Sequence, residues 1–314
     1  MEHRKLIKFG NSSHIVSLPN DWLKKNNLIK GDTLFIEENG NNELVLRSQI
    51  KEKKREEKQI TIDTESKEPE KVGREIISAY INDYRTIKLV GKNIEKNSKK
   101  IREMLKELSG IEILEQTKDH IIAKDFINLE DISMLHLVRR MDILTRNMLN
   151  DAKDSLQRDV YQSLMQRDED INRLVFLAYR LAKFSIENPE YLKNDNLKVL
   201  DFVILWQVAD HIERFADETK RSSRFLRKLE KTIPEKGDLE RIFKDIETCY
   251  LTTMKSLYGK DRTLAFETAD STKKLIEKCE KISNKTKQKN VIILIERLKT
   301  MIDHLRTIYL LIYN

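Results

Sequence analysis

The side chains best suited to a chemical role are two sets of polar residues spaced three and four positions apart. At about 100° per residue, each set falls within about 60° on one face of a helix. Carboxylates stacked in this way repel one another unless water, cations or a metal ion neutralise them. Oxygen ligands favour magnesium, calcium, manganese or iron over soft ions; a solvated surface is the alternative. The six positions are Asp210, Glu213 and Asp217 and, 86 residues later, Glu296, Lys299 and Asp303.

A second group of candidate residues is basic and lies near the start of the chain. Residues 1–30 hold six Lys and Arg against two acidic residues, whereas residues 31–50 hold one Arg against four acidic residues. Such a concentration of positive charge suits DNA phosphates, although ordinary solubility would also account for single lysines. Arg4 is the best candidate for reading a guanine edge, because its planar guanidinium can bond two acceptors. The candidate DNA-binding residues are Arg4, Lys5, Lys8, Asn11, Ser12, Ser13, Lys24 and Lys25.

Several other chemistries are disfavoured, so we expect no enzyme. No Glu-x-x-His pairs, Ser-His-Asp set, phosphate loop or dinucleotide fingerprint stands out. Cys249 and Cys279 stand alone, which favours buried reduced thiols over a disulfide or thiolate zinc site. No apolar run reaches 18 residues, and the start of the sequence lacks the apolar core of a signal peptide. We therefore expect a cytoplasmic protein without a transmembrane segment.

The elements around the basic residues are short. Four strand-like runs, RKLIKFG, HIVSLP, DTLFIEE and ELVLRS, are separated by turn residues, and NDWLKKNNLIKGD predicts a helix between the second and third. We expect Asn20 to cap this helix and Lys30-Gly31 to end it. Because about fifty residues in such short elements bury little surface, a partner chain or domain should complete the core of residues 1–50.

The next two segments differ in composition. Residues 51–58 are of mixed charge without an apolar stripe, which indicates a solvated linker. Residues 59–128 alternate between strand and helix periods, which predicts a small α/β module with helices against one sheet. Its role is open between a spacer and a second dimer contact.

Residues 129–314 predict an all-helical domain, in keeping with only 8 Gly and 4 Pro in 314 residues. Apolar residues recur at three and four residue spacing through six segments, which indicates two antiparallel sets of three helices. We place repeat one at 129–231 and repeat two at 236–314. The six predicted helices span roughly 130–157, 159–187, 195–229, 238–259, 261–284 and 288–313.

Residues 1–48 resemble the AbrB type of swapped-hairpin DNA-binding domain. The resemblance rests on the elements G-N-S, S-L-P, W-L and K-G-D, which occur in this order in RKLIKFGNSSHIVSLPNDWLKKNNLIKGDTLFI. It implies that two chains interleave their hairpins into one dimeric β barrel that binds DNA. A two-fold dimer in turn predicts a two-fold or repeated DNA target.

The helical part resembles the PhoU family of phosphate-uptake regulators. IERFADE and its echo LKTMIDHLRTI are similar to that family's LERIGDHA signature, and QSLMQRDEDINRL to its second-helix pattern. The resemblance implies tandem three-helix bundles whose E/DxxxD motifs bind iron, zinc or other metal ions such as manganese or magnesium. Glu213 and Asp217 keep the motif, and Asp168 lies on the second helix. Two departures, Lys299 for the expected Glu and Asn172 for the expected Asp, imply at most one competent cluster and allow for none.

Together the two resemblances point to a fusion of the kind found in archaeal phosphate regulators. We expect a transcriptional regulator of phosphate uptake that binds DNA as a homodimer and senses phosphate status through the helical bundle. The alternative is an adaptor that docks on a phosphate transporter subunit or a sensor kinase, with an N-terminal domain that only dimerises. The operator, the metal and the sensed signal stay open.

Overall fold

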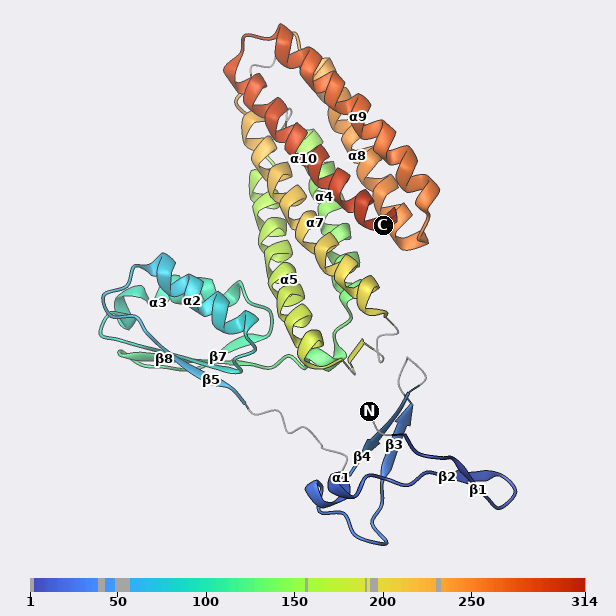
Figure 1. Ribbon diagram of the computed structural model, residues 1–314. Coiled ribbons are helices and arrows are strands. Elements are labelled where there is room, and N and C mark those ends of the chain that lie inside the picture. The colour runs from blue at the N-terminus through green and yellow to red at the C-terminus, as the bar shows by residue number, and fades with distance from the viewer. Residues whose placement is uncertain are drawn as a thin grey trace. The chain divides into compact units, whose positions relative to one another are not determined.

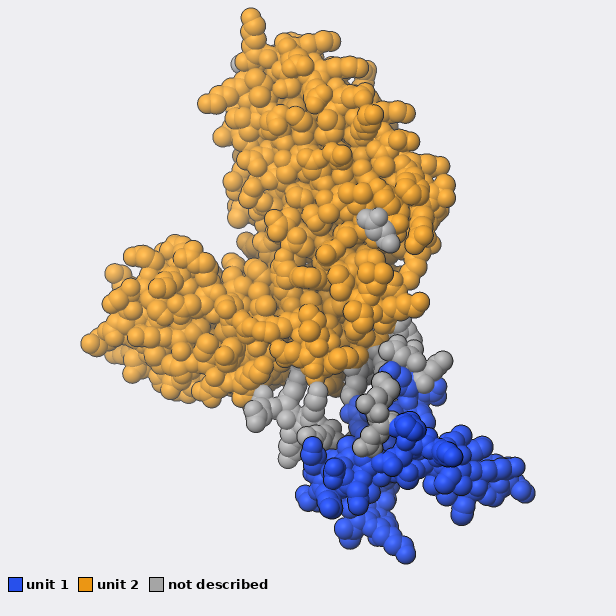
Figure 2. All heavy atoms as spheres, viewed as in Figure 1, with its two compact units in different colours: residues 1–56 blue, residues 57–314 orange. Residues whose placement is uncertain are grey.

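The computed structural model describes residues 3–38, 43–48, 57–155, 158–189, 191–192, 197–229 and 233–313. It divides into two compact units, residues 1–56 and 57–314, which Figure 2 shows in different colours. The first unit is rich in strands, and the second combines an α/β sheet module with a helical region. This is the multidomain α and β architecture that the sequence predicts. The domain boundaries at residues 50, 58 and 128 stay predictions, and residues 51–56 of the predicted linker lie outside the described residues.

The first unit consists of two separate antiparallel hairpins and one short helix. Gly10, with φ of 66°, turns the chain between the first two strands. No described ladder joins the two hairpins, and Figure 1 shows the β1–β2 hairpin extending away from β3, β4 and α1. The elements are β1 (Ile7–Phe9), β2 (Ser13–Ile15), α1 (Asn20–Lys25), β3 (Phe35–Glu38) and β4 (Leu44–Arg47).

The helix of this unit is shorter than the sequence predicts. Pro19 is its N-cap, with no side-chain cap hydrogen bond, so the prediction that Asn20 caps the helix is wrong. The helix ends at Lys25 rather than at Lys30-Gly31, because Asn27 adopts a left-handed conformation with φ of 52°. The Asn26 side chain also donates to the Trp22 carbonyl at 2.8 Å, so it completes the last turn.

The second unit begins with a four-stranded sheet in the order β5-β6-β8-β7. β5 and β6 are parallel and joined through α2, whereas β8 is antiparallel to both β6 and β7. Figure 1 shows α2 and α3 covering one face of this sheet, as the alternating periods predict. The elements are β5 (Gln59–Asp63), α2 (Pro69–Ile81), β6 (Thr86–Val90), α3 (Ile94–Lys106), β7 (Ile111–Gln116), β8 (His120–Asp125) and the short helix η1 (Leu129–Asp131).

Six long helices follow, close to the spans that the apolar periodicity predicts. Their inward side chains form one continuous core, which includes the buried thiols Cys249 and Cys279. Burial raises the pKa of Cys249 to about 11 and that of Cys279 to about 12. The helices are α4 (Met134–Asp154), α5 (Tyr161–Glu187), α7 (Val199–Leu226), α8 (Lys236–Gly259), α9 (Arg262–Lys285) and α10 (Lys289–Tyr313). Among the described residues, no helix is long and apolar enough to span a membrane.

The two sets of three helices meet through α7 and α10, which run antiparallel. His211 of α7 faces His304 of α10, and Glu218, two turns later in α7, accepts from Arg297, two turns earlier in α10. A shift of 86 residues carries His211 onto Arg297 and Glu218 onto His304. The two contacts are therefore equivalent under an approximate two-fold axis, which supports the duplication inferred from the sequence.

A buried ion network joins the α/β module to the bundle. The guanidinium of Arg180 in α5 is fully buried and donates to the carboxylates of Asp83 and Asp125. It also lies 4.7 Å from the centroid of the Tyr80 ring. Arg85 donates to Asp125 as well, so two cations share that carboxylate. The module and α5 therefore contact each other through an ion network in which Arg180 and Asp125 are fully buried.

Candidate functional site

The structure gathers part of the predicted acidic face around a lysine. Asp168 of α5 and Asp217 of α7 both accept from the ammonium of Lys220, which lies 2.9 Å from Asp217. Arg221 also donates to Asp217, at 2.7 Å. Burial raises the pKa of Asp168 despite its bond to Lys220. A cation of the chain itself thus lies where the sequence predicts a metal ion.

Glu213 belongs to the same face and is largely buried. Burial, followed by the charges of Asp217 and Asp168, raises the pKa of Glu213 to about 7. The raised pKa favours the protonated carboxyl at a pH well above the usual range for glutamate. This protonation relieves the repulsion that three neighbouring carboxylates would otherwise produce.

Asp210, the first residue of this set, has partners of its own. It accepts from the hydroxyl of Tyr179 in α5 and from the guanidinium of Arg214 at 2.8 Å. Burial opposes ionisation of Asp210, but these two donors outweigh it, so the pKa of Asp210 lies below its usual range. Asp210 therefore supports the contact between α5 and α7.

The second repeat does not reproduce the arrangement. Glu296 pairs with Lys299 at 3.2 Å, and Asp303 pairs with Arg306 at 3.3 Å. Glu296 and Asp303 are both exposed on α10. These carboxylates form one-turn ion pairs on a solvated helix surface.

As arranged, the acidic residues do not fit a metal cluster. In the part of the chain that the structure describes, no three His, Cys, Asp or Glu side chains gather in a way that could hold a metal ion. Lys220 already pairs with two of these carboxylates, Asp168 and Asp217. Metal binding at Asp168, Asp210, Glu213, Asp217, Glu296 and Asp303 stays a prediction that metal analysis can test.

The predicted DNA-binding residues are all exposed on the first unit. Arg4 and Lys5 precede β1, and Lys8 lies within it, opposite His14 of β2. Asn11 and Ser12 form the hairpin turn, and Ser13 begins β2; Lys24 and Lys25 end α1. The first hairpin thus carries four of the eight candidates, and Arg4 and Lys5 lie in the segment that leads into it.

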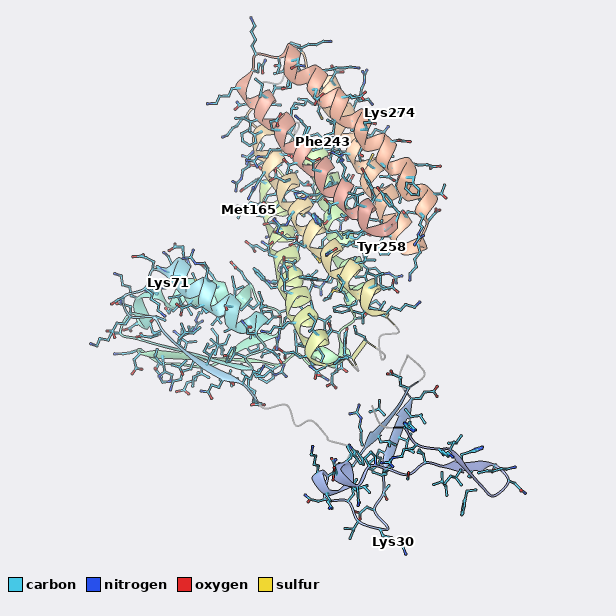
Figure 3. The ribbon with its side chains drawn as sticks, viewed as in Figure 1. Lys30, Lys71, Met165, Phe243, Tyr258 and Lys274 are labelled. Atoms are coloured by element: carbon cyan, nitrogen blue, oxygen red, sulfur yellow. The ribbon has the colours of Figure 1, made fainter. Side chains whose placement is uncertain are left out.

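The same unit leaves its apolar side chains uncovered. None of its described residues is buried, and Ile7 and Phe9 of β1 are 58% and 65% exposed. Ile15 of β2 lies on the same face of the hairpin as these two and is 44% exposed. In Figure 3 the side chains of this unit spread around thin strands and do not fill a space between layers.

Two features of this region, the contact between His211 and His304 and the position of Lys220, were not predicted from the sequence. His211 and His304 face each other across α7 and α10, with 3.3 Å between their Nδ1 atoms. Burial, followed by the charges of His211 and Arg214, lowers the pKa of His304 to about 4. The dipeptide Asp-His, which occurs at 210–211 and again at 303–304, is the sequence signal that could have indicated this pair. For Lys220 the signal is its position one turn after Asp217.

Comparisons with known proteins match two parts of the chain, the strand-rich first unit and the first half of the helical region. A family model described as "Antidote-toxin recognition MazE, bacterial antitoxin" matches residues 7–58. A model of the PhoU domain matches residues 138–226, which end with α7, so the match covers the first three-helix repeat. No curated protein matches the chain. The two matches, in this order, agree with the predicted fusion: a MazE/AbrB-type region at residues 7–58 is followed by a PhoU domain at residues 138–226.

Proposed function

We propose that this protein is a DNA-binding transcriptional regulator of phosphate uptake and phosphate homeostasis. The observation that carries the proposal is the first unit, where exposed apolar side chains and a basic hairpin occur together on the same chain as a PhoU domain. A homodimer would cover the apolar face of the hairpin, including Ile7, Phe9 and Ile15, and would present two basic ribbons to one DNA duplex. It would act in the cytoplasm, where DNA is accessible.

The basic residues suit contacts with the DNA backbone. Lys8 and Lys5 are exposed on or beside β1, and the turn residues Asn11 and Ser12 offer additional donors. Each phosphate that a cation neutralises releases counterions, so binding should weaken steeply with salt. Arg4 is the residue we assign to a guanine edge, since a guanidinium can donate to two acceptors at once.

The PhoU domain supplies the link to phosphate status. A partner such as a phosphate transporter subunit or a sensor kinase, or a bound ion, would have to favour one arrangement of the DNA-binding domains over another. Because the acidic face is already neutralised by Lys220, we place no metal in this mechanism.

The test is to replace Arg4, Lys5 and Lys8 together with alanine. We expect much weaker binding to genomic DNA fragments selected by the unaltered chain, with the slope of log K against log salt reduced by about 4, because a homodimer loses Lys5 and Lys8 twice. A control with Lys96, Lys99 and Lys100 of α3 replaced by alanine removes the same charge from an exposed helix surface. Electrophoretic mobility shifts at several salt concentrations measure both variants.

The contrary outcome favours the adaptor. If the unaltered chain forms dimers but selects no DNA, the N-terminal domain only dimerises, and docking on a transporter or kinase becomes the better explanation. If the triple variant binds DNA as tightly as its control, the interface lies elsewhere. If the chain binds DNA but phosphate status, transporter peptide and metal all leave this binding unchanged, the role in DNA binding stands and the proposed phosphate sensing is wrong.

A further inference from the structure

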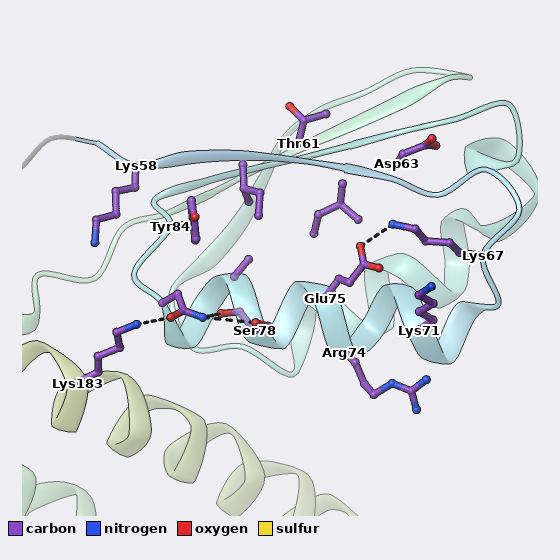
Figure 4. Close-up of a pocket in the computed structure, with 14 residues that line it drawn as sticks. Lys58, Thr61, Asp63, Lys67, Lys71, Arg74, Glu75, Ser78, Tyr84 and Lys183 are labelled. Atoms are coloured by element: carbon purple, nitrogen blue, oxygen red, sulfur yellow. Dashed lines mark hydrogen bonds and ion pairs between the residues drawn. The ribbon is translucent and has the colours of Figure 1, made fainter.

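The α/β module carries a groove that both family matches leave uncovered except at Lys58 and Lys183. It has a volume of about 950 Å³ and runs between β5 and α2, with Lys183 of α5 at one end. Figure 4 shows β5 crossing above α2, with Lys58 near one end of the strand and Lys67 near the other. The groove lies within residues 58–84 apart from Lys183, and the PhoU match begins at residue 138.

The charge of this groove is strongly positive. Its lining holds five cationic residues and two carboxylates, Asp63 and Glu75, and Glu75 already pairs with Lys67 at 2.7 Å. Within the described part of the chain, the structure assigns no hydrogen bond or ion pair to the side chains of Lys58, Lys71 and Arg74. The cationic residues are Lys58, Lys67, Lys71, Arg74 and Lys183.

The backbone of β5 is open along the same groove. β5 is an edge strand whose one described partner is β6. Lys58 accepts from Thr86, and Thr64 donates to Val90, so the even-numbered residues of this segment bond toward β6. In a parallel ladder the residues between them direct their N–H and C=O groups the other way. Gln59, Thr61 and Asp63 therefore present unpaired backbone groups at the open edge.

The side chains of β5 alternate between the face that the helices cover and the opposite face. Ile60 and Ile62 point toward the helices, and Lys58 has the same parity along the strand. A strand added to β5 would direct every second side chain toward Lys58, Lys71 and Lys183. Its other side chains would face away from the helices.

The two edges of the sheet differ in how they resist strand addition. β7, at the opposite edge, has a bulge between Ile113 and Glu115 and carries Glu112 and Glu115. Bulges and charges of this kind protect an edge from pairing. β5 has a regular ladder, and the groove cations beside it, including Lys58 and Lys71, would repel the same groove of a second chain placed antiparallel across a two-fold axis. They would attract an acidic strand.

We propose that the β5 edge of this module binds an extended acidic segment of a partner protein by strand addition, with acidic side chains at alternate positions facing Lys58, Lys71 and Lys183. The backbone groups of Gln59, Thr61 and Asp63 supply affinity, and the cations select the charge pattern. The groove is open and long, which suits an extended chain better than a small anion, since small ligands are usually enclosed on most sides.

The test uses a fluorescent eight-residue peptide that alternates Glu and Thr, with capped ends, and the full chain. We expect saturable binding by fluorescence anisotropy and slower hydrogen exchange in residues 59–63. The double variant Lys58→Glu, Lys71→Glu should bind at least tenfold more weakly. The control Lys96→Glu, Lys100→Glu makes the same charge change on exposed residues of α3 and should bind within twofold of the parent.

Two further peptides separate strand addition from simple charge attraction. Each of the two peptides is methylated at alternate backbone nitrogens, one at the odd-numbered and the other at the even-numbered residues. We expect one of them to lose binding, because its methyl groups block the hydrogen bonds to β5, and the other to bind like the parent peptide. Binding of both methylated peptides, or equal binding of a peptide with four Glu followed by four Thr, would overturn the proposal. So would unchanged binding by the Lys58, Lys71 variant.

Two outcomes would assign the groove to another occupant and also overturn the proposal. Inorganic phosphate that displaces the peptide at concentrations of 1 mM or below would indicate a small-anion site. Self-association in sedimentation, lost in the Lys58→Glu, Lys71→Glu variant, would indicate that a second copy of the chain occupies the edge. Neither readout depends on DNA binding, so the proposed regulator can stand if this inference fails.

Discussion

At the scale of single residues, Lys220 decides the character of the acidic face. Its ammonium lies between Asp168 and Asp217, and its own side chain is 16% exposed, so little water competes for these bonds. Either an ammonium group or a divalent metal ion can neutralise these two carboxylates. While Lys220 is present, a metal ion gains little by approaching them.

Lys220→Ala should therefore convert this pair into a weak metal site. We expect the free energy of unfolding to fall by about 3–5 kcal/mol near neutral pH, because the buried Asp168 loses its cation and Asp217 keeps only Arg221. Millimolar Mn²⁺ should restore part of this loss in the variant and leave the parent unchanged. Thermal unfolding with and without Mn²⁺ measures the effect, and Lys255→Ala on α8 serves as an exposed control.

Metal analysis of the purified parent and Asp217→Ala chains completes this test. Metal that copurifies with the parent and is lost from Asp217→Ala would contradict the account in which Lys220 replaces the ion.

Glu213 makes the stability of the bundle depend on pH. Its pKa is raised to about 7 in the folded chain by burial and by Asp217 and Asp168, against an ordinary value of 4.5. The folded state therefore favours the protonated carboxyl, and stability falls as pH rises from about 4.5 through 7. Glu213→Gln should be more stable than the parent by about 1–3 kcal/mol at pH 8 and nearly equal to it at pH 5.

Urea unfolding at the two pH values measures this difference. Glu267→Gln changes an exposed carboxylate of α9 in the same way and should show no such pH dependence. Equal stabilities of Glu213→Gln and the parent at pH 8 would show that the carboxyl is well solvated.

At the scale of elements, Arg180 holds the α/β module against α5. Its buried guanidinium bonds Asp83 after α2 and Asp125 at the end of β8, and it lies over the Tyr80 ring. Burial outweighs the opposing charge of Arg180 and raises the pKa of Tyr80 to about 12. A motion of the module relative to the bundle would have to break these bonds without access to water.

Arg180→Met should lower the free energy of unfolding by about 3–5 kcal/mol, since it leaves buried carboxylates with one cation fewer. Because Asp125 shares the network, the variants Arg180→Met and Asp125→Asn and their combination form a double-mutant cycle. We expect the two effects to be non-additive by at least about 1 kcal/mol. Additive effects in chemical denaturation would mean that Arg180 acts through packing alone.

At the scale of the whole molecule, the two units differ in how complete they are alone. The second unit has a continuous buried core, whereas the described residues of the first have none. Apolar side chains that stay more than 40% exposed on a short hairpin require another surface to cover them. We expect that surface to be the same hairpin region of a second chain.

Replacing Phe9 and Ile15 together with serine should therefore convert a dimer into a monomer. Size-exclusion chromatography with light scattering measures the mass, and the thermal unfolding of the bundle should not change. The double variant Ile143→Ser, Ile186→Ser removes two exposed apolar side chains from the bundle and should remain dimeric. A dimer that survives the Phe9, Ile15 change would place the contact in the second unit.

The sequence determined the elements of this protein because their signals are local. Apolar spacing predicts the six long helices to within a few residues, and the alternation of periods predicts the α/β module. The short α1 was less predictable, because its end depends on the backbone conformation of Asn27. Acidic residues on one helix face were likewise visible in the spacing of Asp210, Glu213 and Asp217.

Only the tertiary structure decided what neutralises those acidic residues and what they contact. Lys220 reaches Asp168 across two helices, and His211 meets His304 across 93 residues of sequence. The open edge of β5 also follows from the strand order and not from the strand itself. The sequence therefore determined the elements and the charges they carry, and the packing of distant elements decided which charges meet, because that pairing depends on helix crossings that local spacing does not encode.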